Sequence, residues 1–567
     1  MRRLLCFVCF AVLGTNLSAQ NYGFPLDKPL SMSANFGEIR SNHFHSGIDL
    51  RVGGVSGAKV YAVDSGYVSR IYVSPTGFGK ALYIEHPNGR SSVYAHLEGF
   101  AGAIASYASD YQYKRQRFAM NDYTPAGLLT VKKGELIGYA GNTGSSFGAH
   151  LHFEWRETAR QSPLNPVVKG FIKPHDTLPP TFHTLALFTL DTINSLTRPR
   201  LLKSEKTVKK GKSFVPEKTQ VFTVCNPVFL GIHANDYQPA NTSKHGIYRM
   251  KASIDGEPFF GYRMNGIEFA YTRYINSFIA YDELVNSKID YVKTYVEAGN
   301  ILPFYEGLKN RGVLVLNDTL PHSISVEIFD DLGNRSVLDF KIRHSKTVAT
   351  RHQTVSAAQF ISIPWDNSFE YQEEDMEISV EPRSLYSNAL FKTAKTTLDG
   401  AFSPLWTAGY KTVPLQKPVK LKIKPANLPQ RYKQHAFIAR QTETKPVCCG
   451  GKFDANGFLV AEVSEFGDYY VAIDTIPPKI SVASKSGNFT GHAKLTVLIS
   501  DNVSGIDTCN GYIDNKWALF EYDPKTNSMS YTFDPKQMNG KGKNRKLKVV
   551  ATDKCNNSTT FFYDFVY

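Results

Sequence analysis

The sequence predicts a mainly β protein, with an antiparallel-sheet domain at the N-terminus followed by about three β-sandwich-like modules. Three observations support this fold class. Short strand-like runs, such as VYAV at 60–63, are separated by turn signals such as PNG at 87–89. The segment DTLPP at 176–180 recurs as DTIPP at 474–478. The chain has 567 residues, of which 42% are apolar, and at roughly 100–200 residues per domain this length allows three to four domains.

Composition narrows the class of protein. Aromatic residues make up 13% of the chain and charged residues 20%, which is typical of folded rather than disordered protein. The mean hydropathy is −0.28 and the one long apolar run lies at the N-terminus, so a multi-span membrane protein is excluded. The net charge of +14 predicts an anionic partner, such as nucleic acid, an acidic membrane surface or a cell-wall polymer.

The first residues narrow the choice of partner. Arg2 and Arg3 precede an apolar stretch at 4–14, and the small residues of LSA at 17–19 follow it. This pattern predicts a secretory signal peptide, residues 1–19, that is cleaved after Ala19; the run is too short for an uncleaved anchor. Export argues against nucleic acid as the partner. The expected location is the periplasm or cell envelope, or the medium after secretion.

Five cysteines remain after the signal peptide, so they cannot all pair within one chain. Cys509 and Cys555 could form a disulfide. The adjacent Cys448 and Cys449 could form a strained bridge, but they are expected to be two thiols. No CxxC spacing occurs among these five cysteines, so a structural zinc site built from them is not indicated.

Repetition defines the accessory modules. Besides the DTLPP and DTIPP segments, IDG at 254–256 matches IDN at 513–515, and FDDLGN at 329–334 matches ATDKCN at 551–556. We interpret residues 174–345 and 473–567 as two copies of one β-sandwich module, the first with an insertion at 265–315. They resemble the immunoglobulin-like domains of exported bacterial proteins. Residues 346–472 form a further β module of unknown role.

A lysine cluster lies in the first copy. It could contact an anionic cell envelope, or it could be a solvated hairpin, and the second interpretation is favoured because runs of charge usually face water. Its members are Lys203, Lys206, Lys209, Lys210 and Lys212.

The candidate metal-ligating and catalytic residues all lie in residues 20–170. His45 and Asp49 are four residues apart with Gly47 between them, and both side chains are good zinc ligands. In the run HLHFE at 150–154, His150 and His152 alternate with apolar residues, so a strand would present both imidazoles on one face. The alternative is a pair of exposed histidines on an edge strand. His96 follows the run YA at 94–95, and it is a candidate catalytic residue only because the other histidines are present.

The order H-x3-D, Y-x-H-L and a glycine-rich approach to H-x-H resembles the lysostaphin/LytM-type zinc metallopeptidases, the peptidoglycan endopeptidases of peptidase family M23. The resemblance spans about residues 34–168 and includes VYAVDSGYV at 60–68, IEHPNG at 84–89, KKGELIG at 132–138 and GNTG at 141–144. It implies an antiparallel β metallopeptidase domain over residues 20–170.

The resemblance also implies the roles of five residues. His45, Asp49 and His152 match the ligands of one catalytic Zn²⁺, and three protein ligands leave a fourth position for water. His96 and His150 match the two catalytic histidines, one acting as general base and the other stabilising the oxyanion. The implied function is endopeptidase cleavage of peptide cross-links or stem peptides in peptidoglycan.

Two alternatives stay open: a catalytically inactive LytM-like binding or activator module, and a surface adhesin with a vestigial peptidase domain. All five positions are filled, which favours an active enzyme. His43 and His86 are expected to be a rim residue and a turn residue. The insertion at 99–127, which is aromatic and basic, either borders the substrate groove or is a simple surface insertion.

Overall fold

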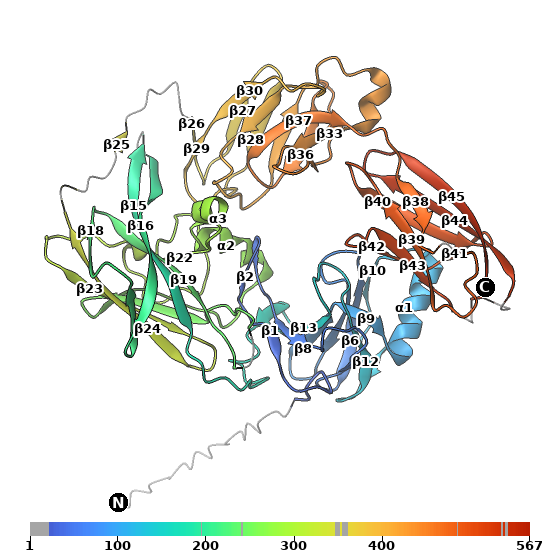
Figure 1. Ribbon diagram of the computed structural model, residues 1–567, viewed down its shortest axis with the longest axis horizontal. Helices are drawn as coiled ribbons and strands as arrows, with labels where there is room; N and C mark the ends of the chain where they lie inside the picture. The colour runs from blue at the N-terminus through green and yellow to red at the C-terminus, as the bar shows by residue number, and fades with distance from the viewer. Residues whose placement is uncertain are drawn as a thin grey trace, which may run out of the picture.

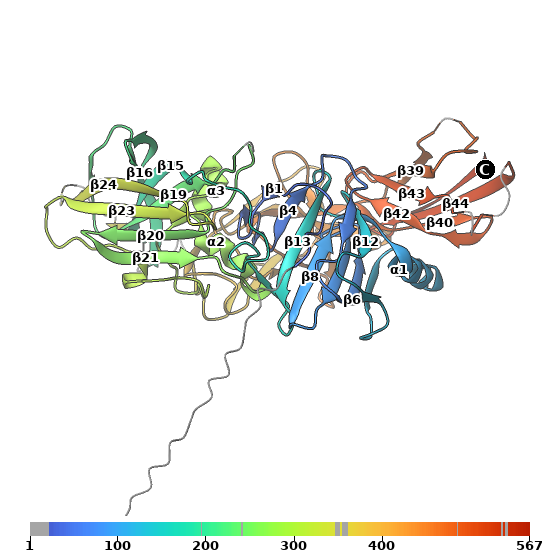
Figure 2. The same ribbon diagram turned by 90° about the horizontal axis from the view of Figure 1, so that it is seen from below.

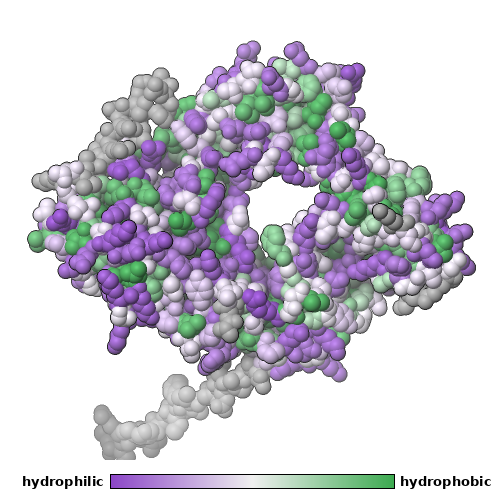
Figure 3. All heavy atoms as spheres, in the orientation of Figure 1, coloured by the Kyte–Doolittle hydropathy of each residue, from purple (hydrophilic) through white to green (hydrophobic). Residues whose placement is uncertain are grey.

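The structure is a computed structural model that describes residues 22–193, 196–239, 242–345, 347, 352–353, 361–484, 486–534, 537–538 and 542–567. The predicted signal peptide lies outside these residues. The chain is mainly β, as the sequence predicts. Four β units form a ring, and the space-filling view shows an opening at its centre (Figures 1, 2 and 3). Within the described part of the chain, no helix has the length and apolarity needed to cross a membrane.

The N-terminal domain contains a nine-stranded antiparallel sheet and a three-stranded sheet. The larger sheet has the order β1-β4-β13-β8-β7-β6-β10, with β11 paired to β6 and β14 to β13, and the smaller has the order β5-β12-β9; β2 and β3 form a separate hairpin. The strands are β1 (Met32–Ala34), β2 (Ile39–Arg40), β3 (His43–Phe44), β4 (Ile48–Arg51), β5 (Lys59–Tyr61), β6 (Gly66–Val73), β7 (Lys80–Glu85), β8 (Arg90–Ala95), β9 (Leu97–Phe100), β10 (Met120–Tyr123), β11 (Thr130–Val131), β12 (Leu136–Ala140), β13 (His150–Glu157) and β14 (Ser162–Leu164).

The core of this domain contains the apolar side chains of β13. Leu151 and Phe153 are fully buried in one cluster with Val60, Leu97 and Ile137 from the smaller sheet. The period-two alternation of β13 therefore separates apolar side chains, which enter the core, from the histidines between them. Packing of these apolar side chains in the core therefore sets the orientation of β13, and this orientation sets the face on which His150 and His152 lie.

The insertion at 99–127 forms helix α1 (Gly102–Arg115). Its apolar side chains Ile104 and Ala108 are buried in the core of the N-terminal domain. On the opposite side, the Tyr113 ring meets the Trp517 ring of the last module edge to face, with centroids 5.3 Å apart. The insertion is thus a docking element between two parts of the ring.

The first accessory module is one long, mainly antiparallel sheet that folds over its own core; β17 and β18 pair with β24 in parallel, as β25 does with β15. Its order is β21-β20-β23-β24-β17-β16-β15-β19-β22, with β18 paired to β24 and β25 to β15. Buried residues from both halves, such as Leu230 and Val326, share one cluster. The strands are β15 (Thr181–Ile193), β16 (Leu196–Lys210), β17 (Ser213–Pro216), β18 (Val221–Val224), β19 (Val228–Asn235), β20 (Arg249–Ile254), β21 (Glu257–Arg263), β22 (Val292–Lys293), β23 (His322–Phe329), β24 (Arg335–His344) and β25 (His352–Gln353).

The insertion at 265–315 supplies the helices of this module. They are the 3-10 helix η1 (Phe269–Tyr274), α2 (Ile275–Phe278), α3 (Tyr281–Ser287) and the 3-10 helix η2 (Asn310–Gly312). The predicted lysine cluster lies on β16 and the turn into β17, in a hairpin, as one of its two interpretations expects.

The middle module packs two five-stranded sheets, β27-β28-β32-β36-β35 and β30-β31-β37-β33-β34, beside the pair β26-β29. Its elements are β26 (Ile361–Ile363), β27 (Phe369–Gln372), β28 (Met376–Val380), β29 (Ala389–Phe391), β30 (Thr393–Thr396), β31 (Leu405–Ala408), β32 (Val419–Ile423), the 3-10 helix η3 (Gln430–His435), β33 (Ala436–Arg440), β34 (Val447–Cys448), β35 (Lys452–Phe453), β36 (Leu459–Val463) and β37 (Gly467–Ile473).

The last module packs two four-stranded sheets, β38-β39-β43-β42 and β41-β40-β44-β45. Its strands are β38 (Lys479–Val482), β39 (Lys494–Ser500), β40 (Ile506–Ile513), β41 (Lys516–Ala518), β42 (Phe520–Asp523), β43 (Ser528–Thr532), β44 (Asn544–Asp553) and β45 (Ser558–Val566). Cys509 lies on β40 opposite Ala551, and the disulfide considered between Cys509 and Cys555 is not formed. The Cys555 thiol instead contacts that of Cys448 in the middle module.

The hydrogen bonds support the repeat and correct its alignment by one residue. Asn334 donates through Nδ2 to Asp330 at 2.7 Å, and Asn557 donates through Nδ2 to Asp553 at 2.7 Å. The equivalent pairs are therefore Asp330 with Asp553 and Asn334 with Asn557. The sequence alone pairs residue 330 with residue 552, because the flanking residues of the two turns differ.

The ring is closed by contacts between the last module and the N-terminal domain. Lys80 Nζ lies 2.7 Å from Glu521 Oε1, and Lys494 Nζ lies 3.4 Å from Glu98 Oε1. Together with the Tyr113–Trp517 contact, these pairs join modules that are about four hundred residues apart in the sequence.

We predict that Glu521→Lys opens the ring. The Lys80 side chain is only 10% exposed, so a second cation beside it costs more than it would at the surface. Small-angle X-ray scattering should show a larger radius of gyration than for the wild type. Glu462→Lys, at an exposed position of the middle module, is the control and should leave the scattering unchanged. Identical curves for both variants would contradict closure through this pair.

Candidate metal centre

Three side chains converge on one point of the N-terminal domain. His45 Nε2 lies 3.1 Å from Asp49 Oδ1, His152 Nδ1 lies 2.9 Å from the same oxygen, and the two nitrogens are 3.0 Å apart. All three residues are buried. The structure thus brings together the residues that the resemblance implied as metal ligands.

The other nitrogen of each ring is already committed. His45 Nδ1 lies 2.7 Å from the Asn35 carbonyl oxygen, and His152 Nε2 lies 2.9 Å from Glu154 Oε1. Because an acceptor requires a proton on these outer nitrogens, the inner nitrogens carry lone pairs in the neutral rings. Two lone pairs and a carboxylate oxygen then face one another, which is unfavourable unless a cation or a proton lies between them.

Strand register produces this convergence. On β4, Asp49 lies directly opposite His152 of β13, and His152 lies opposite Ala95 of β8. Gly47 precedes β4, and a Cβ there would overlap the carbonyl oxygen of Phe153. The segment from His45 to Asp49 can therefore take this path only with glycine at position 47.

A buried ion pair supports His152. Glu154 is fully buried and contacts both His152 and Arg156. Burial alone would raise the pKa of Glu154, but Arg156 and His152 lower this pKa to about 2. The ionised carboxylate in turn orients the His152 ring with Nδ1 towards Asp49.

Burial affects Asp49 in the same way. It would raise the pKa of the Asp49 carboxyl, but His45, His150 and His152 hold this pKa well below its ordinary value. Asp49 is therefore ionised and available as an anionic ligand. Arg40 Nη2, 3.4 Å from Asp49 Oδ2, adds a second positive neighbour.

His96 and His150 lie beside the three ligand candidates. Their ring centroids are 4.9 Å apart, and His96 is 5.8 Å from His152. Nδ1 of His96 lies 2.9 Å from the Thr143 carbonyl oxygen, and Nδ1 of His150 lies 2.8 Å from that of Gly148. Both rings are therefore anchored through Nδ1, and Nε2 remains for chemistry; Nε2 of His150 lies 3.4 Å from Asp49 Oδ1.

The five residues line one cleft, whose walls come from more than one module. His43 and the fully exposed Phe147 also border it, whereas no residue of the 99–127 insertion does among those described. Phe269 and Thr272 of the first accessory module complete one side, and the Thr272 hydroxyl accepts a hydrogen bond from the Phe44 backbone N–H at 3.0 Å.

The last module reaches the opposite rim of the cleft. Lys525 Nζ donates to the carbonyl oxygens of Asn142 and Ser146, at 3.1 Å for Ser146. Ser146 lines the cleft and lies close to His150, with its hydroxyl oxygen 3.4 Å from Nδ1. Two accessory modules therefore border the site.

The donor set fits Zn²⁺. Two imidazole nitrogens and one carboxylate oxygen are ligands that zinc prefers, and tetrahedral bonds of about 2.0–2.1 Å would separate the donors by roughly 3.3 Å. The observed separations of 2.9–3.1 Å lie within a few tenths of an ångström of that spacing. Three protein ligands leave room for a fourth, as in catalytic rather than structural zinc sites.

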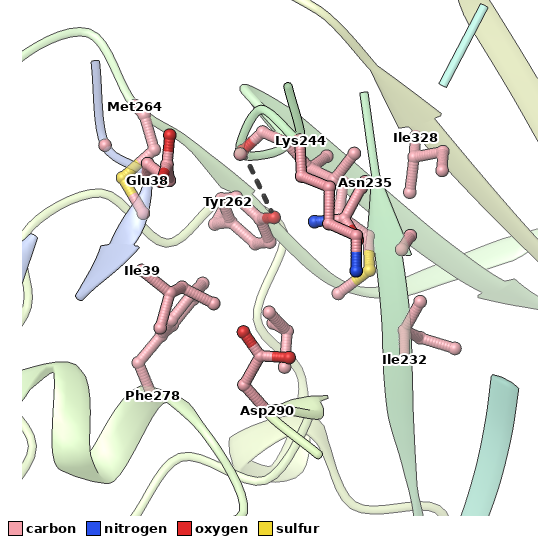
Figure 4. A pocket seen from close by; sticks show the side chains of 16 residues that line it. Glu38, Ile39, Ile232, Asn235, Lys244, Tyr262, Met264, Phe278, Asp290 and Ile328 are labelled. Carbon is pink, nitrogen blue, oxygen red and sulfur yellow. Dashed lines mark hydrogen bonds between the residues drawn. The ribbon is translucent and has the colours of Figure 1, made fainter. Parts of the chain in front are cut away.

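A second cavity lies where the N-terminal domain meets the first accessory module. Figure 4 shows Lys244 and Asp290 extending into it among mainly apolar side chains, such as Ile232 and Phe278. Glu38 lines it from the N-terminal domain. The cavity contains no cluster of metal-ligating residues among those described, and it belongs to the joint between the two units.

Sequence reasoning missed the supporting residues. Glu154 follows His152 by two residues, and period two places both on the same face, but the motif alone assigns Glu154 no role. A carboxylate at that position needs a partner, and His152 and Arg156 provide two. Phe269 and Thr272 lie more than a hundred residues from the motifs, and no local pattern connects them with the cleft.

Comparison with known proteins finds matches to two segments of the chain. Residues 43–107 match the family model of peptidase family M23, and residues 361–474 match that of the Zu5-like domain. The chain is 32% identical over 123 residues to a DD-carboxypeptidase/endopeptidase, Mpg, of Neisseria meningitidis serogroup B, with 22% of each chain covered. It is 29% identical over 150 residues to an uncharacterized metalloprotease of Haemophilus influenzae, covering 25% of this chain and 26% of that one.

Two solved structures are also similar. A zinc-containing peptidase from Vibrio cholerae is 26% identical with a TM-score of 0.19, and the match covers 26% of this chain and 39% of that one. The catalytic domain of lysostaphin from Staphylococcus simulans is 22% identical with a TM-score of 0.19, covering 26% and 93%. The chain thus spans about a quarter or less of the length of the curated relatives it matches.

We predict that Glu154→Gln weakens zinc binding by about 10- to 100-fold, because the amide holds the His152 ring less firmly and lowers its basicity. Competition with a zinc-binding dye measures this affinity. The matched control is Glu157→Gln, at the end of the same strand, which should bind zinc as the wild type does. Equal affinities for Glu154→Gln and the wild type would contradict the role of Glu154.

Proposed function

Because the N-terminal domain belongs to peptidase family M23, we propose that the protein is a zinc-dependent endopeptidase that hydrolyses peptide cross-links or stem peptides of peptidoglycan. One observation carries the proposal: His45 Nε2, His152 Nδ1 and Asp49 Oδ1 meet within 3.1 Å of one another, and each ring donates its remaining N–H elsewhere. Such an arrangement suits a cation, and these donors suit zinc.

The substrate class comes from the relatives. Mpg of Neisseria is named a DD-carboxypeptidase/endopeptidase, and the aligned segment of this chain includes about a fifth of its length. A basic protein with net charge +14 suits an anionic envelope polymer. We therefore propose peptidoglycan as the substrate and the periplasm or cell envelope as the location, with the signal peptide at 1–19 directing export.

The chemistry divides between ligands and proton carriers. Zinc, when bound, would acidify water and polarise the scissile carbonyl. His96 and His150 then act through Nε2, since Nδ1 of each ring is bonded to a backbone carbonyl. One imidazole accepts a proton as general base, and the other donates to the developing oxyanion. Burial, with the nearby His152 and His150, lowers the pKa of His96 to about 3, which keeps this ring neutral.

We predict two classes of alanine variant. His45→Ala, Asp49→Ala and His152→Ala should lose the metal and all activity, because each removes a ligand. His96→Ala and His150→Ala should keep the metal and lose at least about 100-fold in turnover, because each removes a proton carrier. Metal analysis and mass spectrometry of stem peptides released from purified murein measure the two properties separately.

The same experiment distinguishes the alternatives. His86→Ala, at a buried histidine outside the cleft, is the matched control and should keep both metal and activity where it folds. Products that are identical for the wild type and His150→Ala would overturn the enzymatic role. Binding of murein without cleavage by the zinc-loaded wild type would favour a binding or activator module.

A further inference from the structure

Outside the cleft, acidic side chains gather at two equivalent places. Asp176, Asp236 and Asp330 place one carboxylate oxygen each within 4.8 Å of the others, and Asp474, Asp501 and Asp553 do the same. Asp176 and Asp474 are the first residues of the repeated DTLPP and DTIPP segments. Each cluster therefore joins the segment that leads into a module to two loops of that module.

The two clusters share one framework of hydrogen bonds. Asn334 Nδ2 donates to the carbonyl oxygen of Asp176 at 3.2 Å, and Asn557 Nδ2 donates to that of Asp474 at 2.8 Å. Leu178 N–H donates to Asp176 Oδ1 at 2.9 Å, and Ile476 N–H donates to Asp474 Oδ1 at 3.1 Å. The copies have diverged elsewhere, but these matching hydrogen bonds give the two sites the same construction.

In the first cluster, the charge is not compensated. Asp236 is 3% exposed, and its Oδ1 is buried without a hydrogen-bond partner although the carboxylate faces Asp176 and Asp330. Among the described residues, none of the three carboxylates forms an ion pair with a Lys, Arg or His side chain. His175, beside Asp176 in the chain, is the basic group that influences Asp176. A buried carboxylate with unsatisfied oxygens is costly unless it is protonated or binds a cation.

Like charges add to this cost. Burial, with Asp330, Asp176 and Asp331, raises the pKa of Asp236 to about 9. Burial and Asp330 also raise the pKa of Asp331 to about 7. In the second cluster Asp501 has the same feature, since its Oδ1 is buried without a partner while its Oδ2 accepts from Gly505 N–H at 2.7 Å.

From this geometry, we propose that each cluster binds a hard divalent cation, Ca²⁺, which fastens the incoming segment to the loops of its module. The donors are all oxygens, and carboxylates with backbone carbonyls are the ligands of Ca²⁺ rather than of zinc. The flexible coordination of Ca²⁺ tolerates loop-built sites better than the strict octahedron of Mg²⁺. This inference does not depend on the proposed peptidase activity.

The positions give the cations a structural role. Asp331, beside the first cluster, contacts Asn165 of the N-terminal domain, and Leu332 packs against that domain's core. In the second cluster, the Cys555 N–H donates to Asp553 Oδ1 at 2.8 Å, and the Cys555 thiol contacts Cys448 of the middle module. Both cations would therefore stiffen joints of the ring.

Calorimetric titration of the zinc-saturated full chain with CaCl₂ tests the proposal, because zinc occupies the catalytic site throughout. The wild type should bind two Ca²⁺ per chain, Asp236→Asn and Asp501→Asn one each, and the double variant none. Glu257→Gln and Asp507→Asn, exposed acids of the same two modules, are the controls and should bind two. A wild type that binds none, or a double variant that binds two, would overturn the proposal.

Thermal unfolding gives a second readout that also reports folding of the variants. Ca²⁺ should raise the Tm of the wild type by several degrees, and Mg²⁺ at the same concentration by less. Without Ca²⁺, Asp236→Asn should be at least as stable as the wild type, since the substitution removes charge repulsion, and Ca²⁺ should raise its Tm less. A wild-type Tm that is unchanged by Ca²⁺ would contradict the inference, as would an equal response to Mg²⁺.

Discussion

The pairing of β4 with β13 is the constraint on which the candidate metal centre depends. Antiparallel pairing places Asp49 opposite His152, and the hairpin before β4 brings His45 to the same point. A slip of one residue would turn His152 into the core and bring Leu151 or Phe153 to the cleft, since successive side chains point to opposite faces. The fully buried Leu151 and Phe153 prevent that slip, so the packing energy of the core also fixes the metal centre.

The long chain contributes to the same site from outside the domain. The backbone carbonyl of Asn35 orients His45. The side chain of Asn35 in turn binds the backbone of Gly246 in the first accessory module: its Nδ2 donates to the Gly246 carbonyl oxygen at 2.9 Å, and its Oδ1 accepts from the Gly246 N–H at 2.7 Å. Phe36 and Phe44 of the N-terminal domain are buried in the core of that module. The geometry at His45 therefore depends on an interface as well as on a sheet, which gives a physical reason for the extra length.

Much of this was predictable from local patterns. Period-two alternation identified β13, and the H-x3-D and H-x-H motifs identified residues that the fold brings together. The supporting contacts were not predictable, because Glu154 gains its role only when Arg156 is buried beside it, and Thr272 reaches the cleft only through an interface. The insertion at 99–127 shows the same limit. It has the aromatic and basic residues that the sequence shows, but Tyr113 contacts Trp517 of the last module, and no local signal identifies a partner four hundred residues away.

The two related modules have different surroundings although their frameworks match. The first lies on one side of the peptidase domain, and its insertion at 265–315 supplies Phe269 and Thr272 to the cleft (Figure 1). The last lies on the other side and contacts the rim through Lys525, on a hairpin that needs no insertion. The shared hydrogen bonds at Asp330 and Asp553 maintain the fold of each copy, whereas the contacts with the cleft come from parts that differ. Position in the ring, rather than module fold, thus determines what each copy contributes to the cleft.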